Sequence, residues 1–337
     1  MSNDLISILI PCYNTEKYLY KILNCVTNQT YQNLEILILN DGSTDCSLKI
    51  MEEYQSKDSR IKIISRENKG VSASRNELIQ KSTGKYVMFV DSDDLIAPNM
   101  VELLYYALRT HECDLAMCNI LKWYIDETID TTVVPTPTNR YQICTPDDLL
   151  LNMIIVGDHY DFPTAKLIKK ELLDKIEFPL GRVYEDTATL YKIYCRSSKA
   201  IVLEDKLYYY LEMRPDSITT RKYVVKNLND NYLAIRERYE HLLNSNPKII
   251  NEVRLGYIRN CLALLQRVYS TGEDELINNP ITQKIIKEIP EVYSQISNKD
   301  KRNIIINNYR LSLLFLILNG NIEEFSKVIN FVNNKEL

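Results

Sequence analysis

Apolar runs and amphipathic segments alternate along the first 120 residues of the chain. Short apolar runs rich in β-branched residues predict strands, and apolar positions that recur every three to four residues predict helices. The predicted strands are 5–10, 34–40, 61–65 and 86–90, and the predicted helices are 16–29, 45–58, 71–82 and 99–111. We expect Asp45 to cap the second helix. The alternation indicates βαβ units, and therefore an α/β fold with a mostly parallel sheet flanked by helices.

The pattern becomes irregular after residue 120. Residues 120–145 are polar, β-branched and interrupted by prolines, which indicates a loop or a hairpin insertion. Helices are then predicted over 167–178 and 184–196, and a pair of strands over 199–213.

Beyond about residue 221 only helical patterns remain and glycine becomes rare, as is usual for packed helices. We therefore expect an α/β domain over residues 1–220, with halves at 1–120 and 121–220. An all-α C-terminal domain is expected over 221–337.

Four polar segments follow the four predicted strands. They are "PCYN" (11–14), "NDGSTD" (40–45), "RENKG" (66–70) and "DSDD" (91–94). Open α/β sheets bind their ligands beyond the carboxyl ends of the strands. The ligand site is therefore expected at this one edge of the sheet.

The glycines exclude two common nucleotide sites. The chain has only eight glycines, and they form neither G-x-G-x-x-G nor G-x-x-x-x-G-K-[ST]. A Rossmann dinucleotide site and a P-loop are therefore both excluded. A phosphate-bearing ligand would need to be held in another way.

Three carboxylates stand directly after the apolar run "YVMFV", at Asp91, Asp93 and Asp94. Hard divalent cations such as Mg²⁺ or Mn²⁺ prefer oxygen ligands and share them with substrate phosphates. The cluster therefore indicates a cation site. Alternatively, Asp94 or Ser92 could start the turn that leads to Pro98 and the following helix.

The overall composition narrows the range of partners. The chain has 337 residues, of which 45% are hydrophobic and 26% charged, and its net charge is −4. No general attraction to nucleic acid or to anionic lipid follows from this balance. Small molecules or specific surfaces are the expected partners.

The cysteines and apolar runs indicate a cytoplasmic protein. The eight cysteines include no C-x-x-C pair, which argues against a zinc site and a redox motif. No basic segment precedes the first apolar run, so we do not expect a signal peptide. The longest apolar stretch, "LSLLFLIL" at 311–318, is far shorter than the ~20 residues that cross a bilayer.

Four separate motifs together resemble one known family. "ISILIPCYN", "ILILNDGSTD", "NKGVSASRN" and "YVMFVDSDDL" are similar, in order and spacing, to the inverting glycosyltransferases of family 2. Weaker similarity continues through 166–194 and 208–219. The resemblance implies the Rossmann-like GT-A fold, with the nucleotide-sugar-binding half at 1–120 and the acceptor-side half at 121–220.

The resemblance also implies a set of donor contacts, with a UDP-sugar as the donor. Tyr13 is expected to pack on the nucleobase, and Asp41 to accept a hydrogen bond from the uracil N–H. Asn68 and Arg75 are expected to provide further base and phosphate contacts, although Arg75 could equally pair with a neighbouring carboxylate. The remaining donor contacts that the resemblance implies are Pro11, Asn14, Ser92, Arg214 and Ser217.

The catalytic residues are likewise implied by the resemblance. Asp91 and Asp93 correspond to a D-x-D element that holds Mn²⁺ or Mg²⁺ against the donor diphosphate. Asp186 in "YEDTATLYKIY" corresponds to the catalytic base, with Glu185 beside it. Asp186 could also cap the helix predicted to follow. The family often has a histidine as a further metal ligand, and none of the three histidines here has a matching place.

The family also implies the product and the setting. The expected acceptor is a bacterial surface glycan, a teichoic acid, or a lipid-linked or protein-linked glycan, and the expected location is the cytoplasm. No nucleic acid is expected to bind. Work at the inner face of the membrane, and homo-oligomerisation through the helical region, are left open.

Two other interpretations compete with a glycosyltransferase. Haloacid-dehalogenase-type phosphotransferases also place D-x-D after an apolar strand, with the first aspartate as nucleophile. However, their motif lies near the N-terminus and continues with threonine or valine, where this chain has Asp94 and Leu95. A catalytically silent, transferase-like binding subunit is the second alternative. The simultaneous presence of Asp91, Asp93 and Asp186 argues against it.

Overall fold

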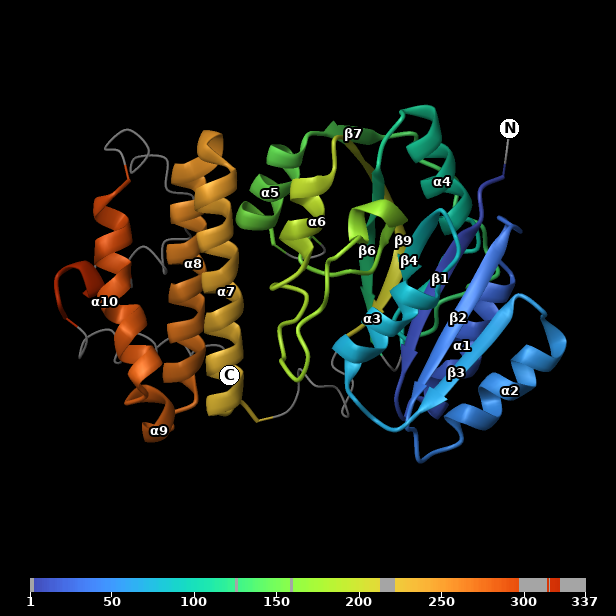
Figure 1. Ribbon diagram of the computed structural model, residues 1–337, viewed down its shortest axis with the longest axis horizontal. Helices are drawn as coiled ribbons and strands as arrows, with labels where there is room; N and C mark the ends of the chain where they lie inside the picture. Colours follow the sequence, from blue (N-terminus) through green and yellow to red (C-terminus); the bar gives the residue numbers. More distant parts are fainter. Residues whose placement is uncertain are drawn as a thin grey trace. The chain divides into compact units, whose positions relative to one another are not determined.

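The computed structural model describes residues 3–124, 127–157, 160–212, 222–296, 314 and 316–321. The chain divides into two compact units, which are coloured along the sequence in Figure 1. The first unit comprises Met1–Leu150 and Asp158–Arg221, and the second comprises Leu151–Gly157 and Lys222–Leu337.

The first part of the sheet is parallel, as the sequence predicts. Its strands lie side by side in the order β3-β2-β1-β4 (Figure 1). They are β1 (Ile6–Cys12), β2 (Leu34–Asp41), β3 (Ile61–Arg66) and β4 (Tyr86–Phe89). The connecting helices are α1 (Glu16–Thr27), α2 (Ser47–Lys57) and α3 (Val71–Lys81). All of these predicted elements are confirmed to within a few residues.

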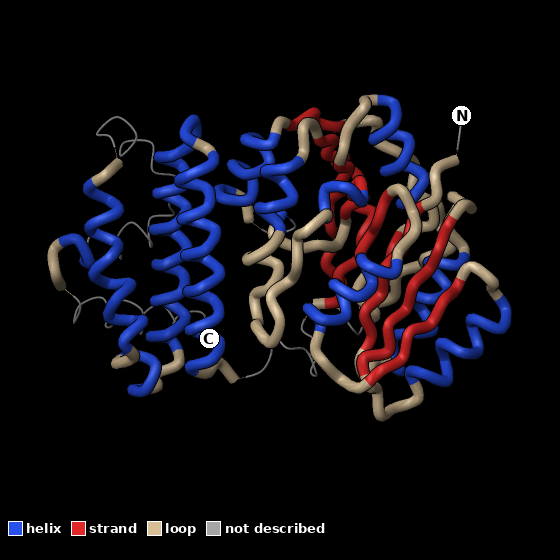
Figure 2. The backbone as a smooth tube through the Cα atoms, in the orientation of Figure 1, coloured by secondary structure: helices blue, strands red, loops and turns tan. Residues whose placement is uncertain are grey.

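The sheet continues beyond β4 in the order β8-β6-β9-β5, with β7 paired to β9. The strands are β5 (Leu95–Ile96), β6 (Leu115–Trp123), β7 (Tyr141–Cys144), β8 (Lys166–Lys169) and β9 (Ala200–Leu211). The helices of this part are α4 (Met100–Thr110), α5 (Pro146–Ile155) and α6 (Leu190–Arg196). Strand β8 is antiparallel to both β4 and β6, while β6 and β9 are parallel. The sheet is therefore mixed in this half, with its strands gathered in one layer in Figure 2.

Three predictions for this half are wrong. The helix expected over 167–178 is instead strand β8 followed by a 3-10 helix, Lys170–Leu173. The helix expected from residue 184 begins only at Leu190, and the strand pair expected over 199–213 is the single strand β9. Pairing in the middle of a sheet overrides local helix propensity.

Helix α1 shows why the first half follows from the sequence pattern. Its buried side chains Leu19, Ile22, Leu23 and Val26 recur at helical spacing and form one apolar stripe. Burying one such side chain stabilises the fold by about 1.5–3 kcal/mol. Strands β1 and β2 are buried along their whole length, as expected for parallel strands covered on both faces.

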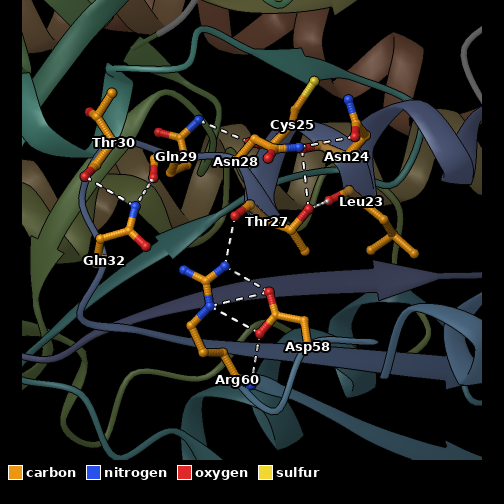
Figure 3. Close-up of polar contacts among 10 residues, drawn as sticks. All are labelled: Leu23, Asn24, Cys25, Thr27, Asn28, Gln29, Thr30, Gln32, Asp58 and Arg60. Atoms are coloured by element: carbon orange, nitrogen blue, oxygen red, sulfur yellow. Dashed lines mark hydrogen bonds and ion pairs between the residues drawn. The ribbon is translucent and has the colours of Figure 1, made fainter. Parts of the chain in front are cut away.

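Arg60 ties α1 to the turn between α2 and β3 (Figure 3). Its Nη2 donates to the carbonyl oxygen of Thr27 and to Asp58 Oδ2, both at 2.7 Å. The Nε atom donates to Asp58 as well. This paired arginine fixes a turn that lies before the start of β3.

The second unit is helical in the part that the structure describes. Its helices are α7 (Val225–Ser245), α8 (Ile250–Ser270), α9 (Asp274–Ile277) and α10 (Pro280–Ser294), with a 3-10 helix at Pro247–Ile249. Helices α7, α8 and α10 lie side by side (Figure 1). A Cβ atom at Gly256 would lie 2.5 Å from Cγ2 of Ile154, so glycine permits this close approach.

Glu288 on α10 joins the helices of this unit. It accepts hydrogen bonds from Tyr232 of α7 and Tyr257 of α8, and pairs with Arg236 of α7. Among the described residues, no helix combines the length and the apolar character needed to cross a membrane. Half of the apolar stretch 311–318 lies outside those residues.

Candidate active site

The loops after β1 and β2 are joined at the carboxyl edge of the sheet. Asn14, whose φ is +52°, accepts a hydrogen bond from the Thr44 backbone N–H at 2.8 Å. Its own backbone N–H donates to Ser43 Oγ at 3.1 Å. Asp45 accepts from the backbone N–H groups of Glu16 and Ser47. Helix α2 begins at Ser47 with Cys46 as its N-cap residue. The prediction that Asp45 is the cap is therefore wrong by one position, because Asp45 precedes the cap residue.

Asp41, at the end of β2, organises the loop that precedes α3. Its carboxylate pairs with the guanidinium of Arg66 and accepts from the backbone N–H groups of Lys69 and Gly70, at 2.9 and 2.8 Å. A Cβ at Gly42 would lie 2.7 Å from the Asn68 backbone nitrogen, so the two loops touch because residue 42 is glycine. Both carboxylate oxygens of Asp41 thus already accept hydrogen bonds.

The D-x-D segment follows β4 and is held by contacts from β9. Tyr208 donates to Asp94 Oδ2 at 2.6 Å, and the Leu211 backbone N–H donates to Asp94 Oδ1 at 2.9 Å. The Asp91 backbone N–H donates to the same Tyr208 hydroxyl. Burial, and then the charges of Asp93 and Asp91, raise the pKa of Asp94 well above its usual value. Asp94 is therefore an internal anchor, whereas Asp91 and Asp93 remain partly exposed.

Arg75 on α3 joins the donor-side loops to the second half of the sheet. The buried guanidinium lies 3.2 Å from Asp91 Oδ1 through Nη2 and 2.6 Å from Glu185 Oε1 through Nη1. Although burial works to lower the pKa of Arg75, the charges of Asp91, Glu185 and Asp186 raise it above the usual value. The sequence allowed Arg75 either to contact a phosphate or to pair with a neighbouring carboxylate, and the structure shows the pairing with carboxylates.

Asp186 lies next to this ion pair, in a turn that precedes α6. Its Oδ1 accepts from the Thr187 backbone N–H at 2.7 Å. Burial, and then the charge of Glu185, raise the pKa of Asp186 to about 7. A carboxylate with this pKa can take a proton from a hydroxyl near neutral pH.

Asp186 is not the N-cap of the next helix, which corrects the expectation from the sequence. The cap residue of α6 is Thr189, and the Asp186 carbonyl oxygen accepts from the backbone N–H groups of Thr189 and Leu190. The chain turns once before the helix begins. Burial, and not a helix N-terminus, therefore dominates the pKa of this carboxyl group.

Lys166 on β8 is a fully buried lysine in this half of the sheet. Its Nζ donates to the carbonyl oxygens of Phe162 and Thr164, at 2.6 and 3.3 Å. Burial lowers its pKa to about 7, while the charges of Cys118, Asp161 and Asp186 oppose this shift. No sequence signal marks Lys166, because "KLIKKELL" has the composition of an ordinary helix.

The structure brings most of the predicted residues to one edge of the sheet. Tyr13 is 48% exposed, which leaves its ring accessible, and Asn68 is exposed too. Pro11 and Ser92 are buried, so their side chains are withdrawn from solvent. Arg214 and Ser217 lie outside the described residues.

Sequence reasoning missed Tyr208, Asn76 and Phe178. Tyr208 is one of three consecutive tyrosines, and nothing local distinguishes it from its neighbours. Phe178 falls at the end of a predicted helix. Only the fold brings it against α3, where Asn76 hydrogen-bonds its backbone.

The residues at the D-x-D segment fit a cation that is shared with a substrate. Among the described residues, no group of three or more His, Cys, Asp or Glu side chains could hold a metal ion. Asp91 and Asp93 offer two partly exposed carboxylates. Mg²⁺ is commonly held by one or two carboxylates together with substrate phosphates, so the donor set suits that arrangement and not a closed protein site.

The mixed sheet with flanking helices, and an acidic site at its carboxyl edge, define a GT-A type of fold. The family model described as Glycosyl transferase family 2 matches residues 7–177. The chain belongs to this family and is a glycosyltransferase, which confirms the resemblance seen in its motifs. The expected fold class is confirmed as well.

Individual relatives agree with this assignment. Glycosyltransferase GlyG of Streptococcus pneumoniae serotype 4 is 34% identical over 223 residues, which cover 62% of this chain and 71% of the relative. Residues 1–349 of TarS from S. aureus, solved in complex with UDP-GlcNAc, superpose with a TM-score of 0.73 at 19% identity. That match covers 98% of this chain and 92% of the TarS chain.

A more distant structure has the same fold. The mannosyltransferase PcManGT from Pyrobaculum calidifontis, in complex with GDP-Man and Mn²⁺, superposes with a TM-score of 0.54 at 14% identity. The match covers 97% of this chain and 86% of the mannosyltransferase.

Proposed function

We propose that this glycosyltransferase is metal-dependent and inverting, and that it moves a hexose or an N-acetylhexosamine from a UDP-sugar to a hydroxyl of a bacterial cell-surface glycan, teichoic acid or glycoprotein. The observation that carries the proposal is the chain of contacts Asp91–Arg75–Glu185, with Asp186 next in sequence. It connects the D-x-D carboxylates to a second carboxylate with a pKa of about 7. These are the two sites that a single-displacement transfer requires.

The donor side is formed by the loops after β1, β2 and β4. The UDP-GlcNAc complex of the TarS structure supports a UDP-sugar as the donor. Tyr13, which is half exposed, packs on the base. Asp41 accepts a hydrogen bond from the uracil N–H, using lone pairs that are not occupied by its contacts within the protein. Asn14, Asn68, Pro11 and Ser92 form the rest of the donor contacts, with Arg214 and Ser217 on the diphosphate.

Asp91 and Asp93 hold Mn²⁺ or Mg²⁺ together with the donor diphosphate. The Mn²⁺ in the mannosyltransferase structure supports a divalent cation in this fold. When bound, the cation neutralises the negative charge that develops on the departing nucleoside diphosphate. Asp94, fixed by Tyr208, orients the segment that carries the two ligands.

Asp186 acts as the general base. It removes the proton from the acceptor hydroxyl while the hydroxyl oxygen forms a bond to the anomeric carbon. The bond from that carbon to the diphosphate oxygen breaks, and its electrons leave with UDP. Attack from the face opposite the leaving group inverts the configuration and needs no enzyme nucleophile. Glu185, held by Arg75, keeps the Asp186 pKa high enough for this proton transfer.

We assign separate roles to the two halves of the α/β domain and to the C-terminal domain predicted from the sequence. Residues 1–120 bind the nucleotide-sugar, residues 121–220 face the acceptor, and residues 221–337 form a helical domain. The acceptor is a surface glycan, a teichoic acid, or a lipid-linked or protein-linked glycan. The enzyme acts in the cytoplasm.

A screen of nucleotide-sugars for hydrolysis and transfer tests the proposal. We expect UDP-sugars to turn over in the presence of MnCl₂, and GDP-sugars to be poor donors because a base that does not match the uracil edge would lose the hydrogen bond to Asp41. Excess EDTA and Asp93→Asn should both remove turnover, while the control variant Asp58→Asn, at the turn shown in Figure 3, should retain it. Full turnover in EDTA, or a retained anomeric configuration by NMR, would contradict the proposal.

A further inference from the structure

Helix α3 grips the segment between β8 and Asp186 through two consecutive residues. The first contact is made by Asn76. Its Nδ2 donates to the Phe178 carbonyl oxygen at 2.9 Å, and its Oδ1 accepts from the Phe178 backbone N–H at 2.8 Å. A side-chain amide that meets both polar groups of one residue fixes the position and the orientation of that backbone.

Arg75 makes the second set of contacts with the same segment. Its guanidinium carbon lies 5.4 Å from the centre of the Phe178 ring, which also packs edge-on against Phe89 of β4. The guanidinium then pairs with Glu185, seven positions further along the chain, and with Asp91 beyond the end of β4. One side chain therefore contacts both ends of the segment and the donor-side carboxylate.

Between these two anchored ends the chain forms a loop with an exposed tip. Leu180 is 67% exposed, and apart from Gly181 itself and its two chain neighbours no residue lies within 4 Å of the position that a Cβ at Gly181 would take. Gly181 and Tyr184 have φ angles of +69° and +62°. Tyr184 therefore adopts a conformation that costs free energy for a non-glycine residue. Such a conformation persists only where its surroundings hold it.

We propose that Arg75 and Asn76 form a positioning clamp that fixes residues 178–185, and that this clamp transmits occupancy of the donor side at Asp91 to the loop carrying Glu185. The coupling rests on the proposed role of Asp91 as a cation ligand. Arg75 contacts neither the donor nor the reacting atoms in this proposal. Its effect is exerted through the placement of Glu185 and of Asp186 next to it.

Electrostatics gives the direction of the coupling. Without a donor, the single positive charge of Arg75 is shared between Asp91 and Glu185. A cation bound at Asp91 attracts that carboxylate and repels the guanidinium, so the attraction between Arg75 and Glu185 becomes the dominant one. The loop should therefore be held more firmly once the cation and nucleotide are bound. Asp186 would then be placed for proton transfer mainly when a donor is present.

Hydrogen exchange of the full chain, measured by mass spectrometry, tests the clamp. Peptides that cover residues 178–186 are compared with and without UDP and MnCl₂, in the wild type and in Arg75→Lys. Lysine keeps the charge but lacks the planar fork that reaches two carboxylates. We expect exchange of the loop to be about tenfold faster in Arg75→Lys. UDP with MnCl₂ should slow exchange of the loop in the wild type and not in this variant.

Two further variants separate the clamp from general destabilisation. Arg60→Lys breaks an arginine–carboxylate pair with Asp58, far along the sequence from the loop (Figure 3), and should leave exchange at 178–186 unchanged. Asn76→Ala removes the other half of the clamp without changing a charge, and should speed exchange of the loop by about threefold or more. If Arg75→Lys does not fold, exchange of the loop in Asn76→Ala still tests the clamp.

The possible results separate the clamp from the coupling. Wild-type exchange at 178–186 in both Arg75→Lys and Asn76→Ala would overturn the clamp, and so would wild-type transfer rates in Arg75→Lys. A loop that is unaffected by UDP and MnCl₂, although calorimetry shows that they bind, would overturn the coupling. If calorimetry shows no binding of UDP, the proposed donor is wrong, and the ligand-free comparison of the variants still decides the clamp.

Discussion

Glu35 is buried and Asp186 is partly buried in the same unit, and the surroundings of these two carboxylates are opposite. Glu35, near the start of β2, accepts four hydrogen bonds, from the Lys62 ammonium, Ser7, and the backbone N–H and hydroxyl of Thr83. Although burial alone would raise its pKa, these bonds lower it to about 2. Asp186 accepts a hydrogen bond from the Thr187 backbone N–H, yet its pKa is raised to about 7.

The fold compensates the negative charge of Glu35 with hydrogen bonds and an ion pair, but it places the negative charge of Glu185 beside Asp186. A fully bonded carboxylate favours the ionised state and stabilises the folded chain. A carboxylate that is buried beside another negative charge favours the protonated state, so it can exchange a proton near neutral pH. On these grounds we expect a structural role for Glu35 and a catalytic role for Asp186.

Of the changes that test this contrast, Asp186→Asn should have the largest effect, which is on the rate of sugar transfer. The substitution keeps the shape and the Thr187 hydrogen bond but removes the basicity. Transfer should fall by about 10²–10⁴-fold, the usual contribution of a general base. UDP binding, measured by calorimetry, should stay near wild type. Because folding raises the pKa of Asp186, the folded protein disfavours the ionised carboxylate, so the free energy of unfolding of Asp186→Asn at pH 8 should equal or exceed that of the wild type. A near wild-type transfer rate would refute the assignment of Asp186 as the base.

The pH dependence of transfer should show the next largest change. The base must be unprotonated to act, so the rate should rise about tenfold per pH unit up to pH ~7 and then level off. Asp186 is faced by Glu185 and Asp161, which raise its pKa, and by Arg75, which lowers it. Transfer rates at saturating donor between pH 5 and 9 provide the measurement. A flat profile down to pH 5 would count against Asp186 as the base.

Removing the charge of Glu35 should affect stability and leave chemistry alone. Glu35→Gln cannot accept all four bonds and loses the Lys62 pair, which should cost about 1–3 kcal/mol at pH 7. Because the folded-state pKa is lowered, the stabilisation is present above the unfolded pKa of about 4.3 and is lost as the pH falls toward about 2. Urea unfolding at pH 7 and at pH 3 should therefore show a smaller difference between variant and wild type at the lower pH.

Glu185→Gln should have the mildest consequence of the four. It removes the like charge beside Asp186, so the rising limb of the pH profile should move to lower pH by less than about one unit. Transfer at pH 8 should fall by no more than about tenfold, because the base itself remains. A loss as large as that of Asp186→Asn would instead make Glu185 a direct participant.

Local sequence is sufficient to specify the first half of the catalytic unit. Strands β1 to β4 and helices α1 to α4 follow from local periodicity, and their alternation leaves few topologies open. The polar segments after those strands can therefore be assigned to one edge of the sheet from the alternation alone. Asp41, Asp91 and Asp93 are found in this way.

Long-range packing specifies the second half. "KLIKKELL" carries a helical composition, yet its first four residues form a central strand because pairing with β4 and β6 outweighs local propensity. The clamp by Arg75 and Asn76, and the Tyr208 support of Asp94, join residues more than a hundred positions apart. The Asp186 pKa follows from burial and neighbouring charge, which depend on how distant segments pack and not on any local pattern.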